Sequence, residues 1–386
     1  MAKYCVEDTT FSNIADAIRE KTGDTAELTP LDMPAAIKGI ETGGGSAELP
    51  EEAFLLTGDC STMFSNNKWK WFLDAYKNKI TTEKITNTQQ MFNYSSEIEE
   101  LPFDFNFDNT THRNMSNMFF LCGKLKTIGK IINAYPNNTE QMFKGCSMLR
   151  ELPEFVNLNM DRIHTYSSAG SKAMFHNCNS LRVIPEELLK QLYNPKAAYY
   201  SSTLSDMFNN CYSLDEIRGV SPKSEVTLAY NVLGSTFVEC NRVKDIIFDT
   251  QEDGTPYVVQ WKTQTLDLTR NVGYQPAGVS EANCIEYNSG ITKDKAVYSD
   301  AQYQALKNDV DWYATAIEYS RYNHDSAVNT INSLPDTSAY LATAGGTNTI
   351  KFKGDAGSAT DGGAINTLTE AEIAVAAAKG WTVTLA

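Results

Sequence analysis

One short phrase recurs along much of this chain and limits what the chain can fold into. It reads "NMFFLCGKLKTIG" from Asn117, "QMFKGCSMLRELP" from Gln141, "AMFHNCNSLRVIP" from Ala173 and "DMFNNCYSLDEIR" from Asp206. Less regular copies place the phenylalanine at 64, 92 and 237, so that the seven phenylalanines are 28, 27, 24, 32, 33 and 29 residues apart. A period of this size predicts stacked repeats that bury their apolar residues against one another.

Within each copy, M-F-x-x-C-x-x-L puts apolar residues at i, i+1, i+4 and i+7, which predicts one short amphipathic helix. Residues that can cap a helix stand just before it: Asn87, Thr88, Asn114, Asn138, Thr139, Ser171, Thr203 and Ser205. The following L-x-x-I/L-P predicts a turn into a short strand, since proline cannot continue a helix. We therefore expect a helix and a strand in every repeat.

Five of the eight cysteines occupy the same position of the phrase: Cys122, Cys146, Cys178, Cys211 and Cys240. No C-x-x-C pair is present and the four histidines are scattered, so a metal site is not expected. We expect buried thiols, because free cysteine behaves as a small apolar residue. Helices in neighbouring repeats would lie roughly 8–10 Å apart, which is too far for a disulfide bond.

The phrase resembles the BspA-like type of leucine-rich repeat over residues 58 to 250. The first two copies depart from it, with Asn67 and Ser95 in place of the cysteine, as terminal repeats would. The resemblance implies an α/β fold class: a leucine-rich-repeat solenoid, with a short helix plus a short strand per repeat. We expect an N-terminal helical hairpin before it and a C-terminal α+β cap after it.

Residues 9 to 40 predict two helices that pack through Ile14, Ile18, Met33, Ile37 and Ile40. Gly23 would end the first helix, while Thr29 and Pro30 would begin the second. The segment "IADAIREKTG…DMPAAIKGI" resembles the N-terminal module of phage tail, baseplate and fibre proteins, which implies an adaptor that docks onto other virion proteins. The alternative is an accessory cap on the repeats.

The C-terminal part predicts an end structure. "VVQWKTQTLDLT" alternates like a strand, and residues 299 to 319 look helical. Thr369 and Glu372 form a predicted capping box before an Ala-rich helix that ends at Gly380 and precedes a last strand. "HDSAVNTINSLPD" and "LTEAEIAVAAAKGWTV" resemble end segments attached to such repeats in phage and gut-bacterial proteins. Asp355 and Asp361 lack EF-hand spacing, which leaves calcium there an open question.

These observations divide the chain into four expected regions: 1–41 as the N-terminal helical attachment module, 42–49 as a Gly-rich linker, 50–250 as the repeats, and 251–386 as a continuation of the repeats with an end cap.

A formal net charge of -15 argues against nucleic acid or an anionic membrane surface as a partner. No apolar run is long enough to insert into a membrane, and the N-terminus does not look like a secretory signal, so we expect synthesis in a bacterial cytoplasm. His112, His164, His176 and His324 have no triad or metal-site neighbours, and no catalytic motif is present. We expect neither an enzyme nor a cofactor.

The two variable positions of L-x-x-I predict two columns of outward side chains. The first holds Glu99, Lys126, Arg150, Arg182, Asp215 and Lys244, and the second holds Glu100, Thr127, Glu151, Val183, Glu216 and Asp245. We name these two columns the polar strip. It is either a solvated ladder of weak salt bridges or a recognition surface for a glycan or protein. Tyr199 and Tyr200, in a long inter-repeat segment, are aromatic anchors suited to the second interpretation.

The leading hypothesis is a phage virion protein of the tail, baseplate or fibre that displays the repeats for host attachment. Its expected location is the virion, and its expected partners are other virion proteins, a bacterial cell-surface glycan or protein, and further copies of itself, for instance in a trimer. The alternatives are a bacterial surface adhesin, a head or capsid decoration protein without a receptor, and an unrecognised glycan-degrading enzyme.

Overall fold

The computed structural model describes most of the chain from residue 54 onward. The described residues are 54–107, 113–160, 170–192, 205–211, 214, 216–220, 233–238, 240, 243, 245–269, 322, 324–352 and 368–385. The expected attachment module with Ile14, Ile18, Met33, Ile37 and Ile40, the linker, and the expected helix at 299–319 lie outside them. Asp215, Lys244, Tyr199 and Tyr200 lie outside them as well, so those predictions stay predictions.

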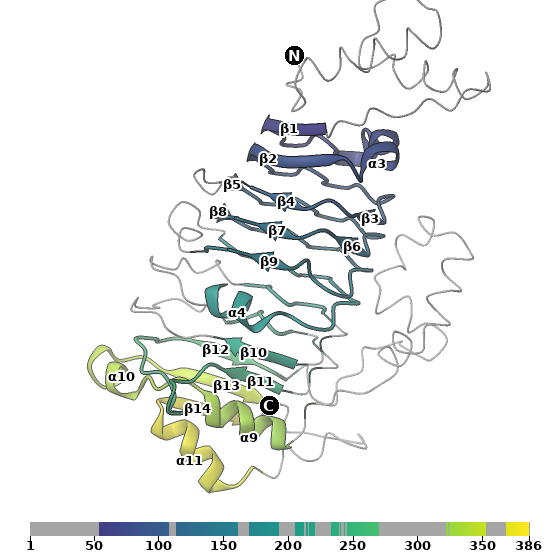
Figure 1. The fold of residues 1–386 in the computed structure, drawn as a ribbon. Helices are drawn as coiled ribbons and strands as arrows, with labels where there is room; N and C mark the ends of the chain where they lie inside the picture. Colours follow the sequence, from purple (N-terminus) through teal and green to yellow (C-terminus); the bar gives the residue numbers. More distant parts are fainter. Residues whose placement is uncertain are drawn as a thin grey trace, which may run out of the picture.

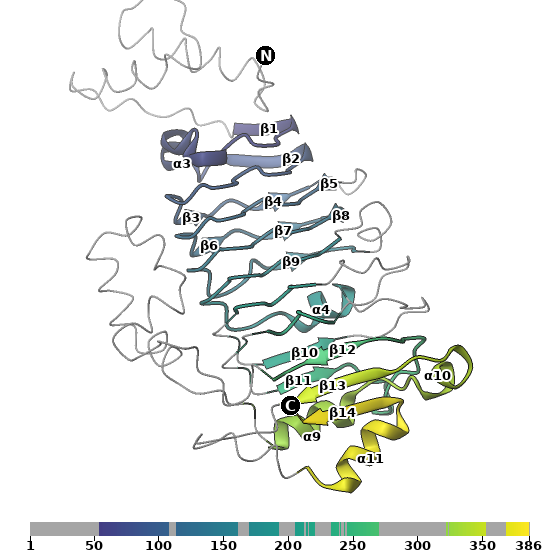
Figure 2. The same ribbon diagram turned by 180° about the vertical axis from the view of Figure 1, so that it is seen from behind.

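Successive repeats lie one beside the next in chain order, and their short strands pair in parallel (Figures 1 and 2). Two short sheets follow one another along one side of the repeats: β3 (Glu100–Leu101) with β6 (Thr127–Ile128), and β10 (Glu216–Val220) with β11 (Asp245–Phe248). The first sheet, β1 (Phe54–Asp59) with β2 (Ile80–Asn87), lies on another side, where Thr82 of β2 donates to the Asp104 carbonyl. Two more follow other sides of the same repeats: β4 (Phe105–Asn106), β7 (Ile131–Ile132) and β9 (Phe155–Val156), and β5 (Arg113–Asn114) with β8 (Pro136–Asn138).

The recurring phrase is a chain of turns and contains no α-helix in the described residues. In six repeats, the residue two positions before the phenylalanine and the residue two positions after it both have left-handed backbone angles. In the repeat of Phe143 these are Gln141 at φ 55° and Gly145 at φ 77°. A right-handed helix cannot contain a left-handed residue every fourth position, so the expected helix is wrong.

Hydrogen bonds explain how this buried turn segment is stable without a helix. The Met142 and Cys146 amides donate to carbonyls three residues earlier, at 3.1 and 3.0 Å, which closes two consecutive turns. Between them, the Phe143 amide donates to the Met174 carbonyl of the next repeat at 2.9 Å. Alternate amides thus bond within and between repeats, so the buried backbone groups are paired.

The three asparagines expected to cap helices form Asx turns instead. The side-chain oxygens of Asn87, Asn114 and Asn138 each accept from the backbone amide two residues later, at 3.0, 3.0 and 2.8 Å. This geometry starts a turn and needs no helix behind it.

The expected fold class, an α/β leucine-rich-repeat solenoid with a helix and a strand per repeat, is therefore wrong. The described chain contains small, separate parallel sheets of two or three strands and a few isolated helices. In the repeat region these helices are η1 (Ser65–Asn67), α3 (Lys70–Tyr76) and α4 (Glu186–Leu192). η1 is a short 3₁₀ turn within the first copy of the phrase, with Asn66 in a left-handed conformation, and neither α-helix is part of the M-F-x-x-C segment.

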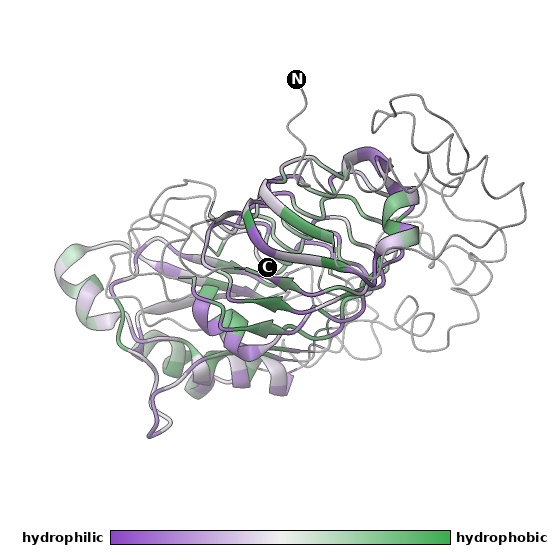
Figure 3. Cartoon of the chain, turned by 45° about the horizontal axis from the view of Figure 1, so that its top comes forward, coloured by the Kyte–Doolittle hydropathy of each residue, from purple (hydrophilic) through white to green (hydrophobic). Residues whose placement is uncertain are grey.

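Seven phenylalanines, one from each copy of the phrase, stack in the core. We call this set the Phe column: Phe64, Phe92, Phe119, Phe143, Phe175, Phe208 and Phe237. Neighbouring rings are 5.2–5.8 Å apart and nearly parallel. All seven side chains are buried. In Figure 3, apolar green and polar purple residues alternate along the elements, as expected where each element buries one face.

All five cysteines of the phrase are buried free thiols, which confirms that prediction, whereas Asn67 at the same position of the first copy is half-buried. Each thiol donates to the carbonyl of the preceding repeat's phenylalanine, for example Cys146 Sγ to Phe119 O at 3.1 Å and Cys178 Sγ to Phe143 O at 3.0 Å. Ser95, in the same position of the second copy, donates in the same way to the Phe64 carbonyl. Neighbouring copies of the phrase do not lie at the expected helix spacing, because their backbones hydrogen-bond to one another at the distance of paired strands.

The C-terminal elements cover the last repeat. They comprise β12 (Thr265–Asp267), α9 (His324–Ser333), α10 (Ser338–Ala344), β13 (Asn348–Phe352), α11 (Glu370–Ala378) and β14 (Trp381–Leu385), with β12, β13 and β14 in one parallel sheet. The capping box of Thr369 and Glu372 is confirmed at the start of α11, and Gly380 at φ 81° follows its end.

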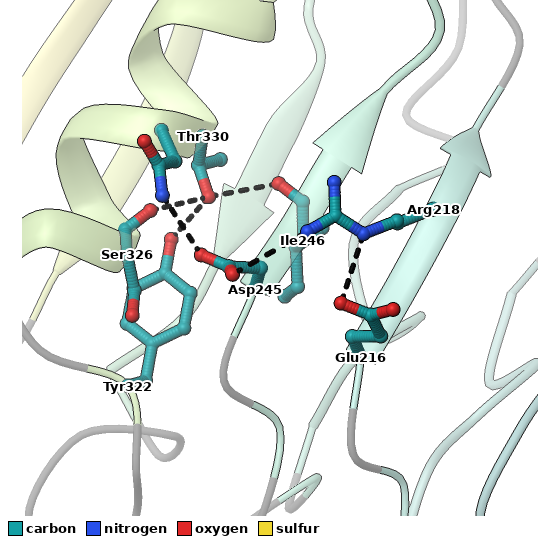
Figure 4. A network of polar contacts seen from close by, with 8 residues as sticks. Glu216, Arg218, Asp245, Ile246, Tyr322, Ser326 and Thr330 are labelled. Carbon is teal, nitrogen blue, oxygen red and sulfur yellow. Dashed lines mark hydrogen bonds and ion pairs between the residues drawn. The ribbon is translucent and has the colours of Figure 1, made fainter.

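Figure 4 shows how α9 is fixed on β11. Asp245, only 4% exposed, accepts from Asn329 Nδ2 at 3.1 Å and lies 3.7 Å from Arg218 Nη2. The Thr330 hydroxyl donates to the Ile246 carbonyl at 2.8 Å and accepts from the Tyr322 hydroxyl. Asn329 and Arg218 satisfy the Asp245 carboxylate, which would otherwise be costly to bury.

Candidate functional site

The polar strip forms on the structure as neighbouring positions of successive repeats. The Lys126 amide donates to the Glu99 carbonyl at 2.8 Å, and the Arg182 amide donates to the Arg150 carbonyl at 3.1 Å. In the second column, Glu100 pairs with Thr127, while Val183 and Asp245 each pair with Glu216. Backbone pairing thus joins successive positions of the strip on either side of residues 126–127 and 150–151, and no strand pairing is present between those two segments.

Exposure differs along the strip. The side chains of Lys126, Arg150 and Glu151 are exposed, those of Arg182 and Glu216 are half-buried, and Asp245 is buried beneath α9. Glu216 is also occupied, because Arg218 Nε lies 2.8 Å from its carboxylate. The accessible part of the strip thus runs from Glu100 to Val183, and its middle lies over the repeats of Phe119 and Phe143.

A surface hollow of about 430 Å³ lies in this middle part. Its polar lining comes from Lys126, Thr127, Arg150, Glu151 and Ser180. Its apolar lining comes from Ile128, Met148 and Leu152, which are all half-buried. Three of the residues expected to bind a ligand, Lys126, Arg150 and Glu151, therefore border one cavity.

The lapse of strand pairing accounts for the position of this hollow. β6 pairs with β3 on one side, and the two form a two-stranded sheet, while residues 150–152 are not in a strand. On the β3 side, Gly129 packs against the backbone of Phe103. A Cβ added to Gly129 would lie 2.2 Å from the Phe103 carbonyl oxygen, so only glycine fits there. The chain directly after β6 thus lies close to the preceding repeat, and the hollow lies on the side of the following one.

Charges around the hollow are partly paired. Lys126 Nζ lies 2.8 Å from Glu99, with 43% and 41% of the two side chains exposed. An ion pair this exposed contributes about 0–1 kcal/mol, so an anionic ligand can replace Glu99 at little cost. Lys126 and Arg150 occupy the same column in consecutive repeats, and both cations border the hollow.

A second exposed line of side chains, which the sequence did not reveal, follows the outer edge of the phrase. Tyr94 is 49% exposed and packs edge-on against Phe120, with ring centroids 5.3 Å apart. Lys144 Nζ lies 5.9 Å from the Phe120 ring centroid.

Burial and, secondarily, the Lys144 charge lower the pKa of His176 to about 4, so this imidazole is neutral at pH 7.

An asparagine ladder, also missed, borders the β4–β7–β9 sheet. Asn133 Nδ2 donates to Asn106 Oδ1, and Asn157 Nδ2 donates to Asn133 Oδ1, both at 3.0 Å. Its signal was present in the sequence, because these asparagines are 27 and 24 residues apart, like the phenylalanines of the same repeats. A smaller hollow of about 320 Å³, lined partly by Asn106, lies beside it.

The described residues contain few groups with reactive chemistry. Burial raises the pKa of the Cys122 thiol to about 12, and it raises those of Cys146, Cys178 and Cys211 as well, which keeps them protonated and unreactive. Within the described ranges, no group of three or more His, Cys, Asp or Glu residues is placed to hold a metal ion. In that same part of the chain, no helix has the length and apolar character to cross a membrane.

In comparisons with known proteins, no family model, no curated protein and no solved structure matches this chain.

Proposed function

We propose that this protein is a phage virion component that binds a bacterial surface ligand through the hollow in the polar strip. The proposal rests on one observation: the side chains of Lys126, Arg150 and Glu151 line the same accessible cavity. Its volume lies within the range of small-ligand sites, about 300–1,000 Å³. The resemblance of residues 9 to 40 to a phage adaptor supports attachment of the chain to a particle.

Several features support binding rather than catalysis. The polar groups at the hollow are two cations, one carboxylate and two hydroxyls, without a histidine or thiol that could act as a base or nucleophile. The thiols of the part of the chain that the structure describes are enclosed in the core. The hollow rests on a stack of repeats whose backbones bond to one another, so its geometry is preorganised, which lowers the entropy cost of binding.

Two measurements test this proposal. Mass spectrometry of purified phage particles should detect the chain as a stoichiometric component. The full chain, clustered on beads to imitate display on a particle, should bind the envelope of the host bacterium, since multivalency raises apparent affinity by about 10²–10⁴. Absence from particles would favour a bacterial adhesin. Presence in particles without envelope binding would favour a decoration protein.

A further inference from the structure

We propose that the ligand of the hollow is an acidic sugar residue within a surface glycan, held by its anionic group between Lys126 and Arg150. This inference rests on the proposed binding function and names its ligand class. It starts from the two cations, which project from the same column of consecutive repeats onto one cavity. Both side chains line this one hollow of about 430 Å³, so both can reach one carboxylate or phosphate group placed in it.

Electrostatics favour an anion at this point of an otherwise acidic chain. Lys126 and Arg150 stand at neighbouring positions, and Arg182 follows in the next repeat. An anion bound in the hollow is attracted by both cations, and arginine adds a planar pair of donors suited to carboxylate or phosphate. The exposed pair between Lys126 and Glu99 is weak enough to be exchanged.

The remaining lining points to a sugar rather than a simple ion or an apolar molecule. Ile128, Met148 and Leu152 offer carbon surface that a small inorganic anion would leave in contact with water. An apolar ligand would instead bury the carboxylate of Glu151 without a donor, which is costly. A sugar ring has apolar C–H faces for the first group and hydroxyl donors for Glu151.

Glu151 also limits the charge of the ligand. It lies beside the two cations and repels a ligand with a second anionic group close to the first. We therefore expect one anionic group per bound sugar. A carboxylate, as in a uronic acid, and a phosphate, as in a sugar phosphate polymer, share this chemistry, and the test separates them.

The test uses the full chain and three soluble probes: an oligogalacturonate, a neutral oligogalactose of equal length, and a polymer of glycerol phosphate. Calorimetric titration should show binding of an anionic probe at least tenfold tighter than of the neutral one. Tighter binding of the oligogalacturonate assigns a carboxylate sugar, and tighter binding of the phosphate polymer assigns the phosphate form. Equal affinity for the neutral probe would overturn the acidic class.

Variants locate the site. Lys126→Gln combined with Arg150→Gln should weaken binding of the anionic probe at least tenfold. Lys84→Gln, which removes an exposed cation of β2 away from the hollow, is the matched control and should leave binding unchanged. An equal loss in the control would show general charge attraction and overturn the proposal.

Thr127→Trp supplies an independent variant that fills the hollow without changing its charge. Thr127 is exposed on β6, where tryptophan is well tolerated, and the thermal unfolding midpoint checks that the variant folds. It should abolish probe binding, and unchanged binding in a folded variant would place the ligand elsewhere. Binding to host envelope with no response to any anionic probe would overturn the ligand class alone. Binding to the probe without binding to host envelope would instead overturn the proposed function.

Discussion

The Phe column and the polar strip run across the same repeats but differ in how far their residues vary. Every position of the column is phenylalanine, and each ring stacks on the next within the core. Along the first column of the strip the described residues change from acid to base, as in Glu99, Lys126, Arg150 and Arg182. The column therefore specifies how repeats stack, and the strip is left free to specify what they bind.

The physical reason is the free energy at each position. A buried aromatic side chain contributes several kcal/mol through its burial and packing. An exposed ion pair contributes about 0–1 kcal/mol, so exchanging one charge for another barely affects folding. The predictions below test this division of roles, from the largest expected effect to the smallest.

Replacing Phe143 by Ala should produce the largest loss of stability. Its ring stacks between Phe119 at 5.3 Å and Phe175 at 5.8 Å, with a fully buried side chain. Deleting a buried aromatic ring costs about 3–5 kcal/mol, because burial is lost and a cavity remains. Denaturant unfolding of the full chain measures this change.

Lys126→Ala, on the strip of the neighbouring repeat, is the control. It should change the free energy of unfolding by less than about 1 kcal/mol. If Phe143→Ala and Lys126→Ala lose similar amounts of unfolding free energy, the proposed difference between the Phe column and the polar strip is wrong.

His176 tests the boundary between core and surface. Its pKa is lowered to about 4 from 6.5 by burial first and Lys144 second. Because the unfolded chain binds the proton more readily, this contribution to stability is complete above pH 6.5 and falls as the pH drops toward 4. At pH 5 the loss should be about 2 kcal/mol, less any screening at the half-buried ring.

Unfolding measured at pH 7.5 and pH 5.0 checks this dependence. His176→Asn cannot titrate, so its stability should change less between the two values. The assignment fails if the variant and the original chain lose stability in parallel.

The thiol position should show a smaller effect. Cys146→Ala removes the hydrogen bond from Sγ to the Phe119 carbonyl, which should cost about 1 kcal/mol. Cys146→Ser should be tolerated better, since Ser95 already makes the same bond in the second copy. Thermal unfolding of both variants compares them, and a greater loss with serine would show that the packing of sulfur, not the donor, matters here.

The sequence revealed the core of this molecule better than its backbone conformation. The spacing of the phrase identified the Phe column and the buried cysteines, because side-chain periodicity reports burial directly. The same spacing did not reveal that the phrase adopts consecutive turns, since apolar residues at i and i+4 fit either a helix or two consecutive turns. Leu121 and Ala173 adopt left-handed angles that these residues seldom adopt alone, so stacking against the next repeat imposes them.

The candidate site was predictable only in part. The L-x-x-I register identified Lys126, Arg150 and Glu151 as neighbours, because paired repeats align equivalent positions. The hollow depends on where strand pairing lapses after β6, which no local pattern encodes. The burial of Asp245 depends on α9, whose Asn329 is 84 residues away along the chain.

The smallest predicted effect separates the turn from a helix most directly. Gln141 has φ 55°, where a residue with a Cβ is strained by about 1 kcal/mol and glycine is not. Glycine also makes the unfolded chain more flexible, which offsets part of that gain. Gln141→Gly should therefore leave the free energy of unfolding unchanged or raise it by less than about 1 kcal/mol. In a helix interior the same substitution would lower it by about 1 kcal/mol.

Lys144→Gly, at a position of the same phrase without a positive φ, is the matched control and should lose stability. Equal losses at both positions would contradict the turn conformation, and a loss at residue 144 alone would support it.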